Sequence, residues 1–88
     1  MKAIRKEERR EGAAIREIPV PEIGDLDLLV KVKAAAMCKS DVDVFEWTPL
    51  VEAANYDLPF TLGHEFAGEV VKAGRLVKNF TPGDHVAG

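Results

Sequence analysis

Three side chains of this sequence have the chemical types needed to hold a metal ion together. Cys38 is the only cysteine of the chain, and His64 and Glu65 stand side by side 26 residues further on. A thiolate and a neutral imidazole are ligands that zinc prefers, and a carboxylate can serve beside them. The sequence therefore indicates a metal centre of borderline softness built on Cys38, His64 and Glu65.

The glycines around this pair support the interpretation. Three of them interrupt the stretch from Leu62 to Gly74, which otherwise alternates as a strand does. A glycine inside a strand marks a bulge, a bend or a close approach to the backbone, which ligand-bearing backbone requires. Taken alone, an isolated histidine in a strand is more often structural, and an isolated cysteine is usually a small buried hydrophobe.

Short strands separated by proline and glycine turns must position these side chains. We expect strands at residues 1–5, 13–20, 28–37, 62–74 and 83–87. The strand at 28–37 has the clearest alternation, with Leu28, Val30 and Val32 on one side, and it delivers Cys38 at its end. Many short strands with little helix predict a mainly β fold, a small, partly open β-barrel with one or two short helices.

A short helix is expected directly after Cys38. Ser40 is predicted as its N-cap and Asp43 as its third helical residue, a variant of the capping box. The helix should end near Trp47, because Thr48 and Pro49 follow, and residues 50–56 are expected to form another helical turn.

The composition excludes several classes of protein. The 88 residues make one small domain at most, and a net charge of −3 gives no basic surface for nucleic acid. No apolar run approaches the roughly 18 residues of a membrane span, and no apolar signal segment follows Met1. One cysteine cannot form an internal disulfide, which fits a reducing compartment. We therefore expect a cytoplasmic protein with neither nucleic acid nor membrane as a partner.

Three motifs, taken together in their order and spacing, resemble those of a known family. The run G-H-E-x2-G-x5-G-x2-V, residues 63–77, resembles the zinc signature of the medium-chain zinc-dependent alcohol dehydrogenases. Residues 38–41, C-K-S-D, resemble that family's catalytic cysteine segment, and residues 83–86, G-D-H-V, resemble its later G-D-x-V strand. Residues 45–63 are most similar to the threonine and polyol dehydrogenase branch.

The resemblance implies that residues 1–88 are the GroES-like N-terminal catalytic domain of an enzyme that uses Zn²⁺ and either NAD or NADP. The implied reaction is oxidation of a small-molecule alcohol, a secondary alcohol such as threonine or a polyol, by hydride transfer. No G-x-G-x-x-G follows a strand here, so we interpret the chain as a fragment without its Rossmann cofactor domain, inactive by itself. The full-length protein is expected to form a homo-oligomer, either a tetramer or a dimer.

The resemblance also implies roles for single residues. Cys38 and His64 would be zinc ligands, a third ligand would come from beyond Gly88, and Glu65 would bind the metal directly or lie beside its ligands. Ser40 would be the first carrier of the substrate's proton, with helix capping as its alternative role. One residue differs from the family pattern.

That residue is Asp43, which stands where the family's proton relay usually has a histidine. Either its carboxyl group takes up protons near neutral pH, or water replaces it, or Asp43 only caps the helix. Lys39 lies where some relatives place a basic side chain near the cofactor's phosphates, and it could equally be surface. Asp41 is expected to orient the local backbone, and His85 to be a surface or packing residue.

Phe45 and Trp47 could line a substrate pocket or simply pack in the core. Two other classes of protein remain open. A zinc-free, quinone reductase-like relative would share the fold but lack the pair Cys38 and His64. A non-enzymatic GroES-like binding module would need neither a metal nor a cofactor.

Overall fold

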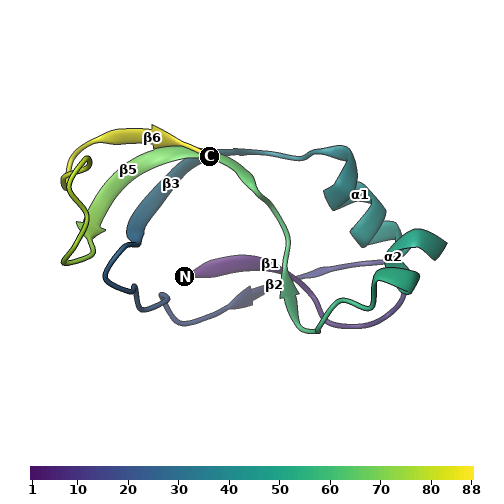
Figure 1. Ribbon diagram of the computed structural model, residues 1–88. Helices are drawn as coiled ribbons and strands as arrows, with labels where there is room; N and C mark the ends of the chain where they lie inside the picture. Colours follow the sequence, from purple (N-terminus) through teal and green to yellow (C-terminus); the bar gives the residue numbers. More distant parts are fainter. The chain divides into compact units, whose positions relative to one another are not determined.

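The computed structural model describes residues 1–88 and contains two three-stranded antiparallel sheets and two short helices (Figure 1). In chain order the elements are β1 (Lys2–Lys6), β2 (Ala14–Glu17), β3 (Leu28–Ala36), α1 (Lys39–Glu46), α2 (Pro49–Ala54), β4 (Phe60–Thr61), β5 (Glu65–Ala73) and β6 (His85–Ala87). Neither sheet closes on itself. The predicted fold class, mainly strands with two short helices, is confirmed. Neither helix has the length and apolar character that a bilayer span requires.

The chain divides into two compact units, each built from two segments. The first unit comprises Met1–Pro19 and Met37–Gly63, and the second comprises Val20–Ala36 and His64–Gly88. Within each unit, residues far apart in the sequence therefore pack against one another.

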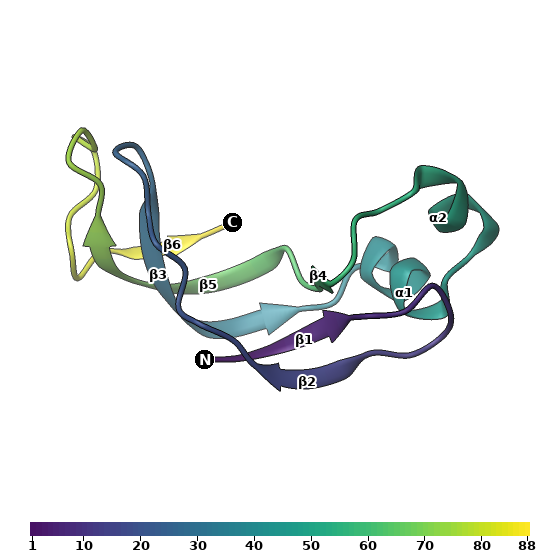
Figure 2. The ribbon, with the colours of Figure 1, turned by 90° about the horizontal axis from the view of Figure 1, so that it is seen from below.

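The first unit contains the sheet β2-β1-β4 and both helices (Figure 2). Its core is formed by Val44 of α1, Val51 of α2 and Leu62 after β4, which are all buried. Trp47 and Phe60 pack against this cluster. The two-residue strand β4 was not expected from the sequence, because two residues show no alternation and only its pairing with β1 reveals it.

The helix α1 begins two residues earlier than the sequence predicted. Its N-cap is Cys38, and its third residue is Asp41, whose carboxylate accepts a hydrogen bond from the Cys38 N–H at 3.2 Å. The prediction of Ser40 as N-cap and Asp43 as third residue is therefore wrong. The carboxylate that accepts from the N–H of the N-cap residue, Cys38, is that of Asp41. The end is as predicted, with Trp47 as C-cap in the left-handed region at φ 59°.

Thr48 and Pro49 end α1 and also begin α2. The Thr48 hydroxyl accepts a hydrogen bond from the Val51 N–H at 3.4 Å, and Pro49 occupies the first helical position. A proline there removes no helical hydrogen bond, because the first amides of a helix have no partner within it. The expected helical turn in residues 50–56 is thus confirmed as part of α2.

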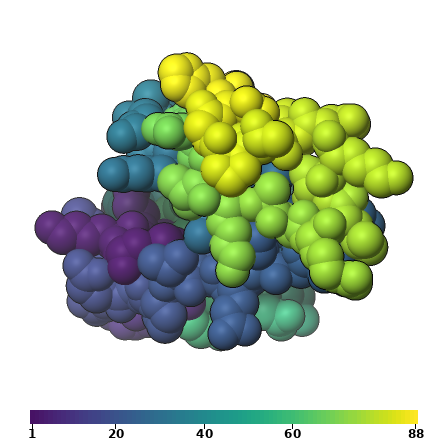
Figure 3. Space-filling model, turned by 90° about the vertical axis from the view of Figure 1, so that its left-hand side faces the viewer, coloured from purple at the N-terminus to yellow at the C-terminus, as the bar shows by residue number.

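The second unit contains the sheet β3-β5-β6, with β5 in the centre. β3 pairs with β5 from Leu28 opposite Ala73 to Ala36 opposite Glu65, with irregularities of register on the way. The shifts lie between Leu29 and Val30 and between Val32 and Ala34, and Val32, expected on the apolar side of the strand, is 54% exposed. β6 pairs along the other edge of β5, and Figure 3 shows its residues, in yellow, on the surface.

The glycines of this region are where the backbone comes closest to other segments, as the sequence indicated. A Cβ atom on Gly68 would lie 2.2 Å from the Lys31 carbonyl oxygen, and one on Gly74 would lie 2.4 Å from the Asp25 carbonyl oxygen. Gly63 has φ +100°, a conformation that side chains rarely permit, and it turns the chain immediately before β5.

Candidate metal centre

The pairing of β3 with β5 explains how residues 26 positions apart come together. Ala36, the last residue of β3, lies opposite Glu65, the first residue of β5. In an antiparallel pair the end of one strand lies beside the start of the other. Cys38 follows this pair by two residues and His64 precedes it by one, so both lie at the same end of the strand ladder.

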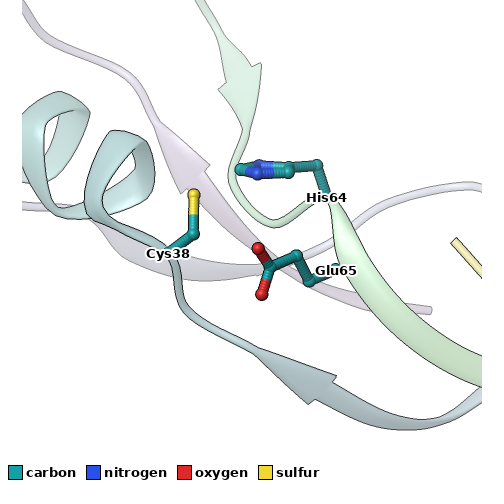
Figure 4. Close-up of side chains that lie close together, drawn as sticks. All are labelled: Cys38, His64 and Glu65. Carbon is teal, nitrogen blue, oxygen red and sulfur yellow. The ribbon is translucent and has the colours of Figure 1, made fainter.

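The donor atoms of Cys38, His64 and Glu65 converge. The thiol sulfur, one imidazole nitrogen and one carboxylate oxygen all lie within 4.8 Å of one another. Figure 4 shows the three side chains pointing toward a shared space, the thiol from the start of α1 and the other two from the start of β5. Cys38 is half-buried, whereas His64 and Glu65 are exposed.

These donors fit a divalent metal of the zinc type. Zinc binds sulfur at about 2.3 Å and nitrogen or carboxylate oxygen at about 2.0–2.2 Å, so tetrahedral ligand atoms lie roughly 3.5 Å apart. The three donor atoms are near enough to reach that spacing by small side-chain rotations. Three protein ligands would leave one coordination position open, as catalytic zinc sites do.

Asp41 joins the segments that carry these donors. It is 4% exposed, and its two carboxylate oxygens accept different backbone hydrogen bonds. One oxygen accepts from the Cys38 N–H at 3.2 Å and the other accepts from the Gly63 N–H at 3.1 Å. The residue that bears the thiol and the residue before His64 are therefore held by one carboxylate, which agrees with the predicted orienting role of Asp41.

The other residues singled out in the sequence lie along α1. The Ser40 Oγ atom is 2.9 Å from the Cys38 sulfur, so the hydroxyl lies directly beside the thiol. The Lys39 ammonium contacts the Asp43 carboxylate at 3.1 Å, and the Lys39 side chain is 87% exposed. The structure thus places the Ser40 hydroxyl beside the Cys38 thiol, while Lys39 and Asp43 form an ion pair on α1.

The two aromatic residues at the end of α1 have different surroundings, and only Trp47 packs against the core. The Trp47 ring packs on the core cluster, and its Nε1–H donates a hydrogen bond to the Glu52 carboxylate. Phe45 is 39% exposed, and its ring faces the Lys6 ammonium. His85 is exposed on β6 opposite Glu69 and is not one of the three converging donors.

Lys6 begins a run of charged residues, 6–11, that the sequence predicts as a solvated surface turn, and for Lys6 this prediction is wrong. It is fully buried at the end of β1, and no local pattern marks it. Its partners come from distant parts of the chain, so only the folded structure shows them.

The chain is similar to several characterised or solved proteins. It is 46% identical to an L-threonine 3-dehydrogenase of Symbiobacterium thermophilum over 99% of its own length and 24% of the relative's. It superposes on the alcohol dehydrogenase TADH from Thermus sp. ATN1 with a TM-score of 0.80 and 36% identity, covering 100% of this chain and 24% of that one. A quinone oxidoreductase from Coxiella burnetii gives 0.84 and 31% identity, covering 100% and 29%.

These proteins differ in their described activities, so the shared fold alone does not identify the reaction. The chain spans about a quarter of the length of the curated relatives that it matches. The sequence profile of the alcohol dehydrogenase GroES-like domain matches residues 24–88, which is most of the chain. Together with the converging thiol, imidazole and carboxylate, this match shows that the chain belongs to the alcohol dehydrogenase GroES-like domain family.

Proposed function

We propose that this chain is the metal-binding, substrate-side part of a zinc- and NAD(P)-dependent dehydrogenase that oxidises a secondary alcohol. The observation that carries the proposal is the convergence of the Cys38, His64 and Glu65 donor atoms within 4.8 Å of one another. Similarity to an L-threonine 3-dehydrogenase makes threonine the first substrate to test, with polyols next.

In this proposal one group of side chains binds the metal and another transfers the substrate's proton. Cys38 and His64 would bind the zinc, Glu65 would bind it directly or lie beside its ligands, and the rest of the complete protein would supply a further ligand. A bound zinc ion would supply Lewis acidity that polarises the substrate's hydroxyl group. Asp41 holds the backbone of Cys38 and of Gly63 in place through its two hydrogen bonds.

Ser40 is the first proton carrier in this proposal. A hydroxyl group can donate and accept at the same time, so the substrate's proton can pass to Ser40 Oγ as the serine's own proton leaves. Beyond Ser40 the proton passes to water, and Asp43, one helical turn further along α1, is the alternative carrier. Lys39 would direct its positive charge toward the cofactor's phosphates, while its ion pair with Asp43 orients it.

The complete protein would carry the remaining parts of the enzyme. We include in the proposal a Rossmann domain with a glycine-rich G-x-G-x-x-G turn for NAD or NADP, and assembly into a homo-oligomer. The relatives' greater length supports the first of these. The reading frame of the complete protein and its mass in solution test both.

Cobalt substitution tests the metal centre directly. Cys38 is the only cysteine of residues 1–88, so the thiolate-to-Co²⁺ absorption band of this site should be lost in Cys38→Ser. The chain has two histidines, which makes His85→Ala a matched control for His64→Ala. We expect His64→Ala to weaken Co²⁺ binding at least about tenfold and His85→Ala to leave it unchanged.

Glu65→Gln and Glu69→Gln on the same strand form a second matched pair, in which only the first should alter the spectrum. Absence of the band in the wild-type protein would refute the metal centre, as would equal Co²⁺ affinities for the two histidine variants. The activity of the complete protein is then measured as NAD or NADP reduction with threonine and with polyols. A protein that binds metal but reduces quinones instead would overturn the proposed reaction.

The proton path is tested by the pH dependence of kcat. Ser40→Ala should lower kcat by about 10²-fold or more, the usual contribution of a general acid–base group. The Asp43 carboxylate is engaged by the Lys39 ammonium, so we expect water rather than Asp43 to take the proton from Ser40, and Asp43→Asn should leave the pH–rate profile unmoved. Lys39→Met breaks the same ion pair but keeps the carboxylate. A large shift with Asp43→Asn but not with Lys39→Met would place Asp43 in the path.

A further inference from the structure

Lys6 is an unusual lysine because none of it is exposed. Its ammonium donates hydrogen bonds to three backbone carbonyl oxygens, those of Gly12 at 2.6 Å, Phe45 at 2.9 Å and Arg10. Three acceptors use all three of its protons. The Nζ atom also lies 5.8 Å and 5.4 Å from the ring centroids of Phe45 and Trp47, within cation–π range.

These contacts fix the C-terminal end of α1. Phe45 lies in the last turn of that helix, which has no basic residue of its own there. The C-terminal end of a helix carries partial negative charge, which Lys6 offsets from strand β1, whose end lies beside α1 (Figure 2). The Gly12 N–H donates to the same Phe45 carbonyl at 2.9 Å, so the turn after β1 is joined to the helix as well.

Keeping a charge in this place is costly. Burial lowers the pKa of the Lys6 ammonium, and the carboxylates of Glu11 and Glu8 only partly oppose that effect by raising it. An apolar side chain at this position would leave three backbone carbonyl oxygens without their donor and would lose both ring contacts. Lys6 therefore holds the turn after β1 and the end of α1 in one fixed arrangement.

Helix α1 connects the contacts of Lys6 with the candidate metal centre. α1 has eight residues, about 12 Å of continuous hydrogen-bonded helix, so a shift at its C-terminal end is transmitted to its N-terminal end. That N-terminal end carries Cys38 and Asp41, and Asp41 holds the Gly63 N–H at 3.1 Å, one residue before His64.

We propose that Lys6 is a positioning residue of the metal centre, which holds α1 so that Cys38 and Asp41 keep their places beside Gly63. The inference rests on the proposed function, because it assigns to a residue remote from the donors an effect on metal binding. It predicts that Lys6 and the metal site are energetically coupled.

The test compares Lys6→Met with Lys2→Met in the complete protein. Both lysines lie on β1, but Lys2 is exposed. Co²⁺ affinity is measured by competition with a chelator, together with the thiolate-to-cobalt band and the Tm of the metal-free protein. We expect Lys6→Met to weaken Co²⁺ binding about tenfold and to shift the band, as changes behind metal ligands do, and Lys2→Met to change neither.

The possible results distinguish failure of the proposed function from failure of the positioning role of Lys6. A wild-type protein without the cobalt band overturns the proposed function and this inference together. A normal wild-type band with equal affinities in the two lysine variants overturns the inference alone. A lower metal-free Tm for Lys6→Met with unchanged Co²⁺ affinity also overturns it, because that is the behaviour of a merely structural residue.

If Lys6→Met does not fold, amide hydrogen exchange in the wild-type protein gives the answer. Coupling is reciprocal, so zinc binding should slow exchange of the Gly12 amide, which donates to Phe45, by about fivefold. The Ile18 amide, which donates to the Met1 carbonyl in the same unit, is the reference and should not change. Equal exchange of the Gly12 amide with and without zinc would overturn the inference.

Discussion

At the scale of single residues, the candidate site depends on how backbone groups hold the donors. Cys38 and His64 are common residue types, and neither would mark a metal site by itself. What distinguishes them is the buried Asp41, whose two carboxylate oxygens accept hydrogen bonds from the backbone N–H groups of Cys38 and Gly63. A carboxylate with two backbone donors is held firmly, because hydrogen bonds to a charged acceptor are stronger than neutral ones.

Asp41→Asn should therefore weaken both the fold and metal binding. The amide side chain lacks the charge and one acceptor oxygen, so we expect the free energy of unfolding to fall by about 1–3 kcal/mol. Zinc affinity should fall about 10- to 100-fold, as for other groups that orient metal ligands. Urea unfolding of the metal-free protein and chelator competition measure the two effects. The same change at exposed Asp57 is the control, and an unaltered zinc affinity in Asp41→Asn would contradict the orienting role.

At the scale of elements, two features determine where the donors sit. The first is the start of α1 at Cys38, which makes the thiol-bearing residue part of a helix cap. The second is the close pairing of β3 with β5, which Gly68 permits by carrying no side chain. Helix α2 contributes less to the site itself, but Glu52 on it links Arg9 with Trp47 at the end of α1.

Gly68→Ala should disrupt the pairing of β3 with β5. The added Cβ atom would lie 2.2 Å from the Lys31 carbonyl oxygen, which is backbone and cannot rotate away. Overpacking of this kind typically costs about 1–3 kcal/mol of unfolding free energy. Gly24→Ala is a matched control, since its Cβ atom would meet only the movable Asp27 side chain at 3.1 Å. Equal urea midpoints for the two variants would show that the strands can separate without loss.

Glu52 predicts a dependence of stability on acid pH. Its hydrogen bond from Arg9, followed by that from Trp47, lowers the pKa of the Glu52 carboxyl group in the folded state. A lowered folded-state pKa adds stability that is present above the ordinary value of about 4.5 and is lost as the pH falls through the lowered value.

The acid limb of the stability curve should therefore be shallower in Glu52→Gln than in the wild type. Urea midpoints measured from pH 7 down to about pH 3 give the comparison, because acid protonates the paired carboxylates over this range. Glu46→Gln at the end of α1 serves as the control for loss of one negative charge. If Glu52→Gln and the wild type lose stability in parallel, the ion pair contributes nothing that depends on pH.

At the scale of the whole molecule, folding brings together segments that are distant in the sequence. Each compact unit consists of two separate stretches of chain, so the contacts that define it are long-range ones. A zinc ion would be bound by Cys38 and His64, which lie 26 residues apart in the sequence. Because the unfolded chain does not hold these residues together, metal binding should stabilise the folded state.

Removal of zinc should lower the Tm of the complete protein. A ligand present at 100 times its Kd adds about 2.7 kcal/mol of stability, which chelation with EDTA would remove. The Tm of the His64→Ala variant should respond little to the chelator, whereas that of His85→Ala should fall as in the wild type. Differential scanning calorimetry with and without EDTA makes the comparison. An EDTA effect of the same size in His64→Ala would place the metal elsewhere.

The amino-acid sequence by itself determined the mainly β fold, the approximate position of most strands and both helices, and the family. Alternation, proline and glycine positions act over a few residues, so they can be read locally, and the G-H-E and C-K-S-D motifs carry the family resemblance. Two features were decided by the tertiary structure alone: the start of α1 at Cys38 and the burial of Lys6. Each depends on partners far along the chain, such as Gly63 for Asp41 and Phe45 for Lys6, and such partners are set by packing rather than by local preference.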